Sequence, residues 1–83
     1  MRYLDRDGRE ITLDQFATEP CNRVAVTKLE RCTVSTIWTG LDVGDGLIFE
    51  TLIICGGDVE DSERYATELD AARGHLRWVE RYS

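Results

Sequence analysis

The nine-residue segment LIFETLIIC, residues 47–55, constrains the fold most strongly, because it predicts a strand that is apolar on both faces. Side chains alternate across a strand. One face carries Leu47, Phe49, Thr51 and Ile53, and the other carries Ile48, Glu50, Leu52 and Ile54. A strand of this kind is typical of the middle of a sheet that is covered on both sides. The chain therefore needs a second layer for each face.

Two strands are expected before this one, in RVAVTKLE at 23–30 and CTVSTIWTG at 32–40, which alternate and are rich in β-branched residues. The second strand places Val34, Thr36 and Trp38 on one face and Thr33, Ser35, Ile37 and Thr39 on the other. The break LDVGDG at 41–46 has glycines on both sides of Asp45 and predicts a hairpin connection. A phosphate-binding loop is not indicated, because the break lacks G-x-x-x-x-G-K and precedes a strand.

The amino-terminal segment alternates around Asp7-Gly8 and predicts a small hairpin with strands near residues 2–5 and 9–12. Thr12 lies three residues before Gln15, the spacing of a capping box, so a short helix is expected in LDQFA. Pro20 should end it, because the residue before proline avoids helical angles.

A carboxy-terminal helix is expected to begin after Thr67, with Asp70 at the third helical position of a capping box. Its predicted core-facing stripe consists of Leu69, Ala72, Leu76 and Val79, and a second stripe beside it consists of Ala71, His75, Trp78 and Tyr82. Gly74 weakens the helix by about 1 kcal/mol relative to alanine, which suggests close packing or a tolerated defect.

Together these elements predict a single small α+β domain over residues 1–83. The expected sheet is antiparallel, with three main strands extended by the amino-terminal hairpin, and the carboxy-terminal helix packs on one face. The second face is expected to be covered either by a second copy of the chain, in a homodimer, or by the short helix at 13–18.

The three cysteines, Cys21, Cys32 and Cys55, form no C-x-x-C pair and are odd in number, which argues against a disulfide framework or a zinc site. They are expected to be reduced. The apolar runs are too short to cross a bilayer, and the amino terminus opens with charged residues. These features predict a soluble cytoplasmic protein.

The net charge of −6 is concentrated in residues 42–70, which hold nine acidic residues against the single Arg64. Such a segment disfavours direct nucleic-acid binding, which depends on Lys and Arg at phosphates. A basic protein surface is the expected partner, and no membrane contact is indicated.

The candidate binding residues come from two acidic segments and the aromatic edge of the last helix. They are Asp42, Asp45, Asp58, Glu60, Asp61, Glu63, Trp78 and Tyr82. The segment DVEDSE at 58–63 is expected to be a loop, either merely solvated or used for docking. No calcium-binding pattern is present, so neither a metal nor a cofactor is expected. His75 is the only histidine and has no evident catalytic partner, so no catalytic residue is assigned.

The segments VSTIWTGLD, LIFETLI and ERYATELDAARGH resemble a family of small uncharacterised bacterial and phage proteins that read VSTVWLGLDH, PLIFETMVF and ERYATEEEALAGH. The start, YLDRDGREITLDQF, is also similar, so the resemblance extends over most of the chain. This sequence has Val43 in place of the family's usual histidine, and its insert is reduced to Gly44-Asp45-Gly46. A catalytic role that used this histidine would therefore not be shared.

The resemblance implies a setting in phages and mobile elements of bacteria. There, by analogy, a small acidic binding protein is expected to act as an inhibitor of host defence, including anti-CRISPR proteins, by occupying a basic nucleic-acid-binding surface. Because the two acidic segments flank one strand about 30 Å long, the predicted acidic surface is an extended stripe. The alternative function is a small enzyme or a metal-dependent accessory protein, which stoichiometric metal in the purified protein would favour.

Overall fold

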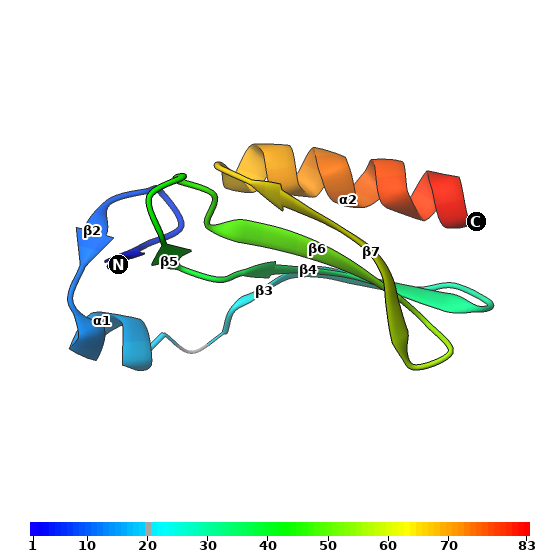
Figure 1. Cartoon of the computed structure of the whole chain (residues 1–83), viewed down its shortest axis with the longest axis horizontal. Coiled ribbons are helices and arrows are strands. Elements are labelled where there is room, and N and C mark those ends of the chain that lie inside the picture. The colour runs from blue at the N-terminus through cyan, green and yellow to red at the C-terminus, as the bar shows by residue number, and fades with distance from the viewer. Residues whose placement is uncertain (20) are drawn as a thin grey trace.

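The computed structural model describes residues 1–19 and 21–83, which form two antiparallel sheets and two helices (Figure 1). The elements in chain order are β1 (Arg2–Leu4), β2 (Glu10–Ile11), α1 (Leu13–Ala17), β3 (Arg23–Lys28), β4 (Cys32–Trp38), β5 (Leu41–Asp42), β6 (Phe49–Cys55), β7 (Asp58–Tyr65) and α2 (Glu68–Tyr82). The predicted α+β class with an antiparallel sheet and a carboxy-terminal helix is confirmed. In Figure 1, α2 lies along one face of the larger sheet, and the smaller sheet lies with α1 at the end away from the β6–β7 hairpin.

The larger sheet has four strands in the order β3-β4-β6-β7, so the apolar segment is central as predicted. The prediction of three main strands was wrong, because residues 58–63 are part of β7 and not a loop. Gly56 and Gly57, with φ of 61° and 89°, reverse the chain within two residues. The strand that follows pairs with β6 from Cys55↔Asp58 to Phe49↔Tyr65. An edge strand can keep its charged side chains in water, which is why so acidic a segment can be a strand.

The amino-terminal hairpin does not extend this sheet, as was expected, but forms a separate sheet in the order β2-β1-β5. The partner strand β5 comes from the segment that was expected to be only a turn. Gly40 makes this possible, because it adopts φ +69° and a Cβ there would lie 2.7 Å from ring atoms of Phe16 and Trp38. The two sheets are joined through Leu4, whose N–H donates to the Gly40 carbonyl at 2.9 Å and whose carbonyl accepts from Trp38 Nε1 at 3.1 Å.

Helix α1 begins with the predicted capping box, in which the side chains and backbones of Thr12 and Gln15 bond reciprocally. It ends at Ala17 with Thr18 as its C-cap, while the predicted stop at Pro20 lies outside the described residues. Phe16 places its ring 4.8 Å from that of Tyr3 and 5.5 Å from that of Trp38. The helix therefore packs at the β1 end and does not cover the second face of β6, as one of the two alternatives had required.

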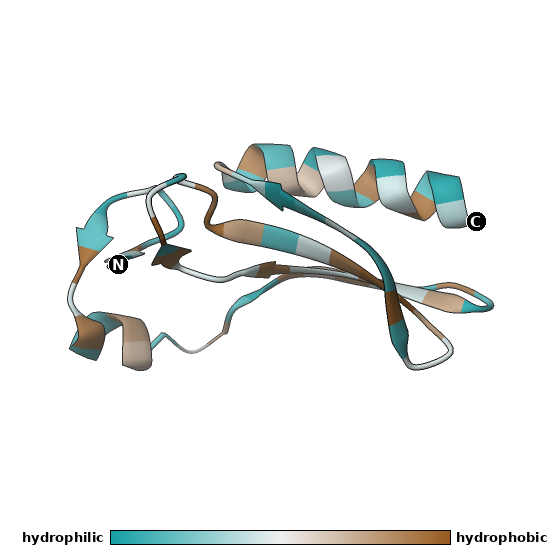
Figure 2. Ribbon diagram, viewed as in Figure 1, coloured by the Kyte–Doolittle hydropathy of each residue, from teal (hydrophilic) through white to brown (hydrophobic). Residues whose placement is uncertain are grey.

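The core lies between α2 and one face of the larger sheet. It includes Val34, Trp38, Phe49 and Ile53, on the strand faces predicted from alternation, together with Ile48, Tyr65 and Ala71. Figure 2 shows hydrophobic residues over most of β6, with a hydrophilic interruption near its start.

The predicted core stripe of α2 was wrong, since Leu69 and Leu76 are 60% and 68% exposed. The second stripe faces the sheet, with Ala71 and His75 buried and Trp78 and Tyr82 half-buried. Gly74 explains the choice of face, because a Cβ at this position would lie 2.3 Å from Tyr65 Oη. Small residues at 71 and 74 let the helix approach the sheet more closely than leucines would allow.

Cys32 and Cys55 form a disulfide, contrary to the expectation that all three cysteines are reduced. They are direct partners in the pairing of β4 with β6, with their Cα atoms 4.2 Å apart. Sequence spacing carried no sign of this pair, since antiparallel pairing brings together residues 23 positions apart. Cys21 is free and exposed.

Candidate functional site

Asp42, one of the predicted binding residues, is buried and holds the LDVGDG break in shape. Its Oδ1 accepts the N–H groups of Gly44 at 2.9 Å and Gly46 at 3.0 Å, and its Oδ2 accepts from Arg2 Nη2 at 2.7 Å. The Gly44 N–H, followed by Arg2 and the Gly46 N–H, lowers the pKa of Asp42 to about 2. This carboxylate is satisfied within the fold and is not available to a partner.

Asp45 also has a structural role in the same turn. Its Oδ1 accepts the N–H of Leu47 at 3.0 Å, and its Oδ2 accepts from Arg64 Nη1 at 2.8 Å. The break therefore turns the chain and ties it to β7. Across residues 1–19 and 21–83, no group of three His, Cys, Asp or Glu side chains is arranged to hold a metal ion.

Glu63 connects β7 with α2. Its Oε1 accepts from Tyr65 Oη at 2.7 Å and from Trp78 Nε1 at 3.0 Å, and Arg77 Nη2 lies 3.7 Å away. Burial, together with hydrogen bonding to this carboxylate, raises the pKa of Tyr65. Glu63 is therefore occupied by interactions within the protein.

Trp78 and Tyr82, the predicted aromatic anchors, lie together at the carboxy-terminal end of α2 with ring centroids 6.1 Å apart. The Arg81 guanidinium lies 5.2 Å from the centroid of the Trp78 ring. Both rings are half-buried, so they border the core and keep part of their surface accessible.

Three of the predicted acidic residues remain unneutralised, namely Asp58, Glu60 and Asp61 at the start of β7. Asp58 and Glu60 are exposed and Asp61 is half-buried. None of the three forms an ion pair with any residue in the described part of the chain. The register with β6 shifts between Ile53↔Asp61 and Ile54↔Val59, which leaves Glu60 as the extra residue of a bulge. These three residues are the candidate docking site, called here the acidic edge.

The acidic edge and the Asp42–Asp45 turn lie at opposite ends of β6 and β7, as the sequence predicted. Asp45 bonds to Arg64 near the end of β7, whereas Asp58 begins β7 after the hairpin. The predicted continuous stripe of six carboxylates is therefore reduced to three at one end, because the other three are paired or bonded within the fold.

A buried hydrogen-bond chain under α2 was not foreseen from the sequence. His75 Nε2 lies 2.9 Å from Thr27 Oγ1 and His75 Nδ1 lies 2.7 Å from Thr36 Oγ1. Thr36 Oγ1 in turn bonds to Thr51 Oγ1 on the neighbouring strand. The only signal was that threonines occupy inward positions of three strands. Burial lowers the pKa of His75, and a ring with 3% exposure has no access for a substrate.

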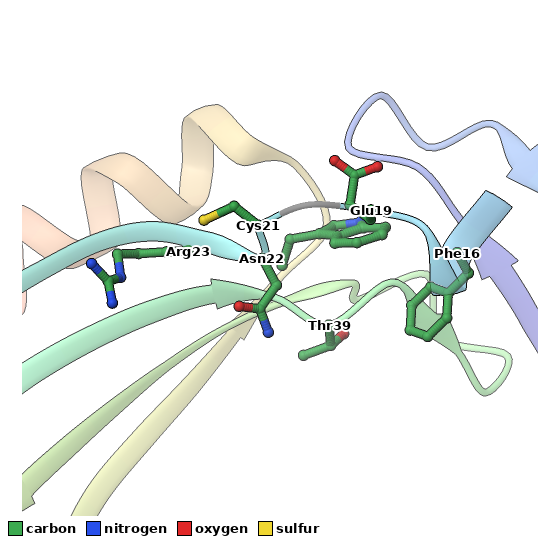
Figure 3. A pocket seen from close by; sticks show the side chains of 7 residues that line it. Phe16, Glu19, Cys21, Asn22, Arg23 and Thr39 are labelled. Atoms are coloured by element: carbon green, nitrogen blue, oxygen red, sulfur yellow. The ribbon is translucent and has the colours of Figure 1, made fainter.

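A cavity of about 370 Å³ lies between α1 and the start of β3, and the side chains that form it are shown in Figure 3. Its lining residues are Phe16, Glu19, Cys21, Asn22, Arg23, Trp38 and Thr39. None of them was among the predicted binding residues. The lining combines two aromatic rings with one acidic and one basic side chain and the exposed thiol of Cys21.

In comparisons with known proteins, no family model, no curated protein and no solved structure matches this chain. Within the described residues, no helix is long and apolar enough to span a membrane. The site therefore has to be interpreted from its own geometry and charge.

Proposed function

We propose that this protein is a non-catalytic binding module that docks on a basic protein surface through the acidic edge, Asp58, Glu60 and Asp61. The observation that carries the proposal is that these three carboxylates share the start of an edge strand and have no cation from the described chain beside them. Clustered carboxylates attract a basic surface and repel the phosphates of nucleic acid.

The proposed partner is a nucleic-acid-binding complex of host defence, of the kind that anti-CRISPR proteins inhibit. The resemblance to phage and bacterial proteins supports this setting, and the charge supports the mode of action. Three carboxylates on one strand can bind the arginines and lysines that otherwise hold DNA or RNA. Trp78 and Tyr82 are the aromatic residues proposed to add apolar contact on the α2 side.

This partner implies the cytoplasm of a bacterial host as the site of action. Cytoplasmic thiol systems keep most cysteines reduced, so Cys32 and Cys55 would act there as a neighbouring dithiol. The two cysteines are direct partners in the pairing of β4 with β6.

The test uses three tagged baits in a bacterial lysate, namely wild type, D58N/E60Q/D61N and the control D7N/E19Q/E30Q. The control removes the same charge at exposed acidic residues outside β7. Quantitative mass spectrometry should find a basic protein that is retained by wild type and the control and lost from the β7 variant. Moderate salt should weaken the capture, because exposed charges are screened over about 8 Å.

Two results would count against the proposal. One is a partner that all three baits retain equally at low and moderate salt. The other is a captured protein whose nucleic acid is not displaced when the purified module is added. Either result would remove the acidic edge as the binding determinant.

A further inference from the structure

The Cys32–Cys55 bond lies in the last cross-strand row of β4 and β6, just outside the covered core. Cys32 shares a face with Val34 and Cys55 shares a face with Ile53, which is the face that α2 covers. Val34 and Ile53, in the next row on this face, have 0% exposure, whereas both cysteines are half-buried. Thiols in solution can therefore reach the bond while the core beside it stays closed.

The turn between β6 and β7, directly beyond this row, contains no buried side chain. Residues 56–60 are all exposed, including Val59 at 59%. Only the first two cross-strand pairs of β7 join this segment to β6, because the register shift after Val59 leaves Glu60 as the extra residue of a bulge. The segment 56–60, called here the tip, is thus held by two backbone pairs and, through Cys55, by the disulfide.

The tip carries most of the acidic edge. Asp58 and Glu60 belong to it, and Asp61 follows directly. Asp58 is the strand partner of Cys55, which is the strand partner of Cys32, so one cross-strand row connects the disulfide with the acidic edge. A covalent link within this row restricts the movement of the tip. The arrangement of two carboxylates therefore depends on a bond that can be opened.

We propose that Cys32 and Cys55 form a redox switch that controls the acidic edge. This inference rests on the proposed function, because it concerns the regulation of the same site. With the bond closed, the tip is held against the sheet and presents Asp58 and Glu60 in a fixed arrangement. With the bond open, the tip moves locally, and a partner has to order it on binding. The affinity for a basic surface should then fall about tenfold, because this ordering costs conformational entropy.

The switch is opened by thiol–disulfide exchange with a cytoplasmic reductant, either glutathione or a thioredoxin-type protein. A thiolate of the reductant attacks one sulfur of the bond and forms a mixed disulfide, and the other cysteine leaves as a thiolate that takes up a proton. A second thiol of the reductant then displaces the attached cysteine, so the protein gains two thiols and the reductant becomes a disulfide. Oxidised glutathione drives the reverse reaction. The acidic edge should therefore bind more tightly under oxidising conditions.

Backbone order parameters test whether the bond holds the tip. The Cys21→Ser background is used, because it removes the free thiol and leaves Cys32 and Cys55 as the only cysteines. The folded protein is equilibrated with reduced or oxidised glutathione, and nitrogen-15 relaxation is measured. On reduction, residues 56–60 should fall below about 0.6, while the buried rows of β4 and β6 stay near about 0.85.

Cys32→Ser/Cys55→Ser in the same background is the control, and its tip should match the reduced protein in both buffers. Two results overturn the switch. One is a tip with the same order parameters in both buffers, and the other is a bond that reduced glutathione does not open in the folded protein.

Calorimetry with a lysine peptide of about ten residues, a basic probe for the acidic edge, tests the effect on binding. The oxidised form should bind the peptide about tenfold more tightly than the reduced form, and D58N/E60Q/D61N should bind weakly in both. Equal affinity of the two redox forms, with loss in the triple variant, overturns the switch and leaves the proposed function in place. A triple variant that binds as tightly as the wild type overturns the proposed function instead, and with it the role of the tip in binding.

Discussion

At the scale of single residues, His75 shows how a group can be decisive for the fold without being a catalyst. Both ring nitrogens bond to threonine hydroxyls of the sheet, and the ring is buried between α2 and β4. A buried polar side chain is costly unless its partners are present. The histidine therefore fixes where α2 sits along the sheet.

This burial predicts a pH dependence of stability. The pKa of His75 is lowered in the folded state by burial, whereas the unfolded chain titrates near 6.5. Below about pH 6.5 the unfolded state binds a proton that the folded state does not, so stability is full above this value and falls as the pH decreases. The slope should reach at most about 1.4 kcal/mol per pH unit for one proton.

Urea unfolding at pH 7.5, 6.5 and 5.5 measures this dependence. Since the chain has no other histidine, His75→Gln should be less stable but nearly flat over the same range. Equal stability of the wild type at all three values would contradict a buried neutral imidazole.

Gly74 gives a second prediction at the residue scale, in which two effects oppose each other. Alanine is better than glycine in a helix by about 1 kcal/mol. A Cβ at this position would lie 2.3 to 2.4 Å from Tyr65 ring and hydroxyl atoms, and overpacking of this kind costs about 1–3 kcal/mol. Tyr65 is held by its bond to Glu63 and has little freedom to move.

Gly74→Ala should therefore lower the free energy of unfolding, against its helix propensity. Leu76→Ala, two positions along on the exposed side, should change it by less than about 0.5 kcal/mol. A stabilised Gly74→Ala variant would mean that Tyr65 yields to the new methyl group.

At the scale of elements, alternation predicted the strand faces well and helical periodicity failed. The buried side chains of β4 and β6 follow from strand geometry, because successive side chains alternate between only two faces. In α2 two neighbouring stripes were both apolar, and hydrophobicity favoured the one with leucines. The buried stripe contains Ala71 and Gly74, because close approach to Tyr65 outweighs the gain from burying larger side chains.

The elements that the sequence did not predict depend on contacts between distant segments. Residues 58–63 were predicted to be a loop because the segment is acidic. They belong to β7 because the turn at Gly56-Gly57 brings them beside β6. Strand β5 has only two residues and exists because β1 lies beside it. Of the eight predicted binding residues, three became the acidic edge, and the internal partners of Asp42, Asp45 and Glu63 cannot be recognised from spacing.

The Cys32–Cys55 bond predicts a stabilising link between β4 and β6. Closing a loop across 23 positions in the unfolded chain should contribute about 3 kcal/mol in the chain-entropy model. Cys32→Ser/Cys55→Ser should keep the wild-type circular dichroism spectrum and lose about this much stability.

Cys21→Ser is the control, because Cys21 is exposed and unbonded. A reducing agent should lower the denaturation midpoint of the wild type and of Cys21→Ser alike, without affecting the double variant. Insensitivity of the wild type to reduction would contradict the bond.

At the scale of the whole molecule, the amino-terminal hairpin is attached to the larger sheet and to α2 through Leu4 and Arg6. Trp38 and Gly40 bond to Leu4, and Arg6 donates to the Arg23 carbonyl at 2.9 Å and pairs with Glu68 at 3.4 Å. Inside the small sheet, the Arg2–Asp42 ion pair joins β1 to β5. Leu4 belongs to the same buried cluster as Trp38 and Phe49, but Ile11 and Phe16 are only partly buried against it. The amino-terminal part should therefore open more readily than the rest.

Asp42 provides the test of this separate opening. Asp42→Asn keeps an oxygen that can accept the N–H groups of Gly44 and Gly46 but removes the charge that binds Arg2. Amide exchange should accelerate in β1 and β2 and stay unchanged in β4 and β6. Asp45→Asn is the matched control, because Asp45 lies in the same turn and bonds to Arg64 instead.

The same ion pair predicts a pH dependence of the opening. In the wild type, the folded-state pKa of Asp42 is about 2 and lies below the usual 3.8. The Arg2–Asp42 ion pair is therefore fully present above about pH 4 and is lost as the pH falls towards 2. Exchange in β1 should consequently accelerate over this interval beyond the change seen in Asp42→Asn. Equal acceleration in all strands would show instead that the two sheets open as one unit.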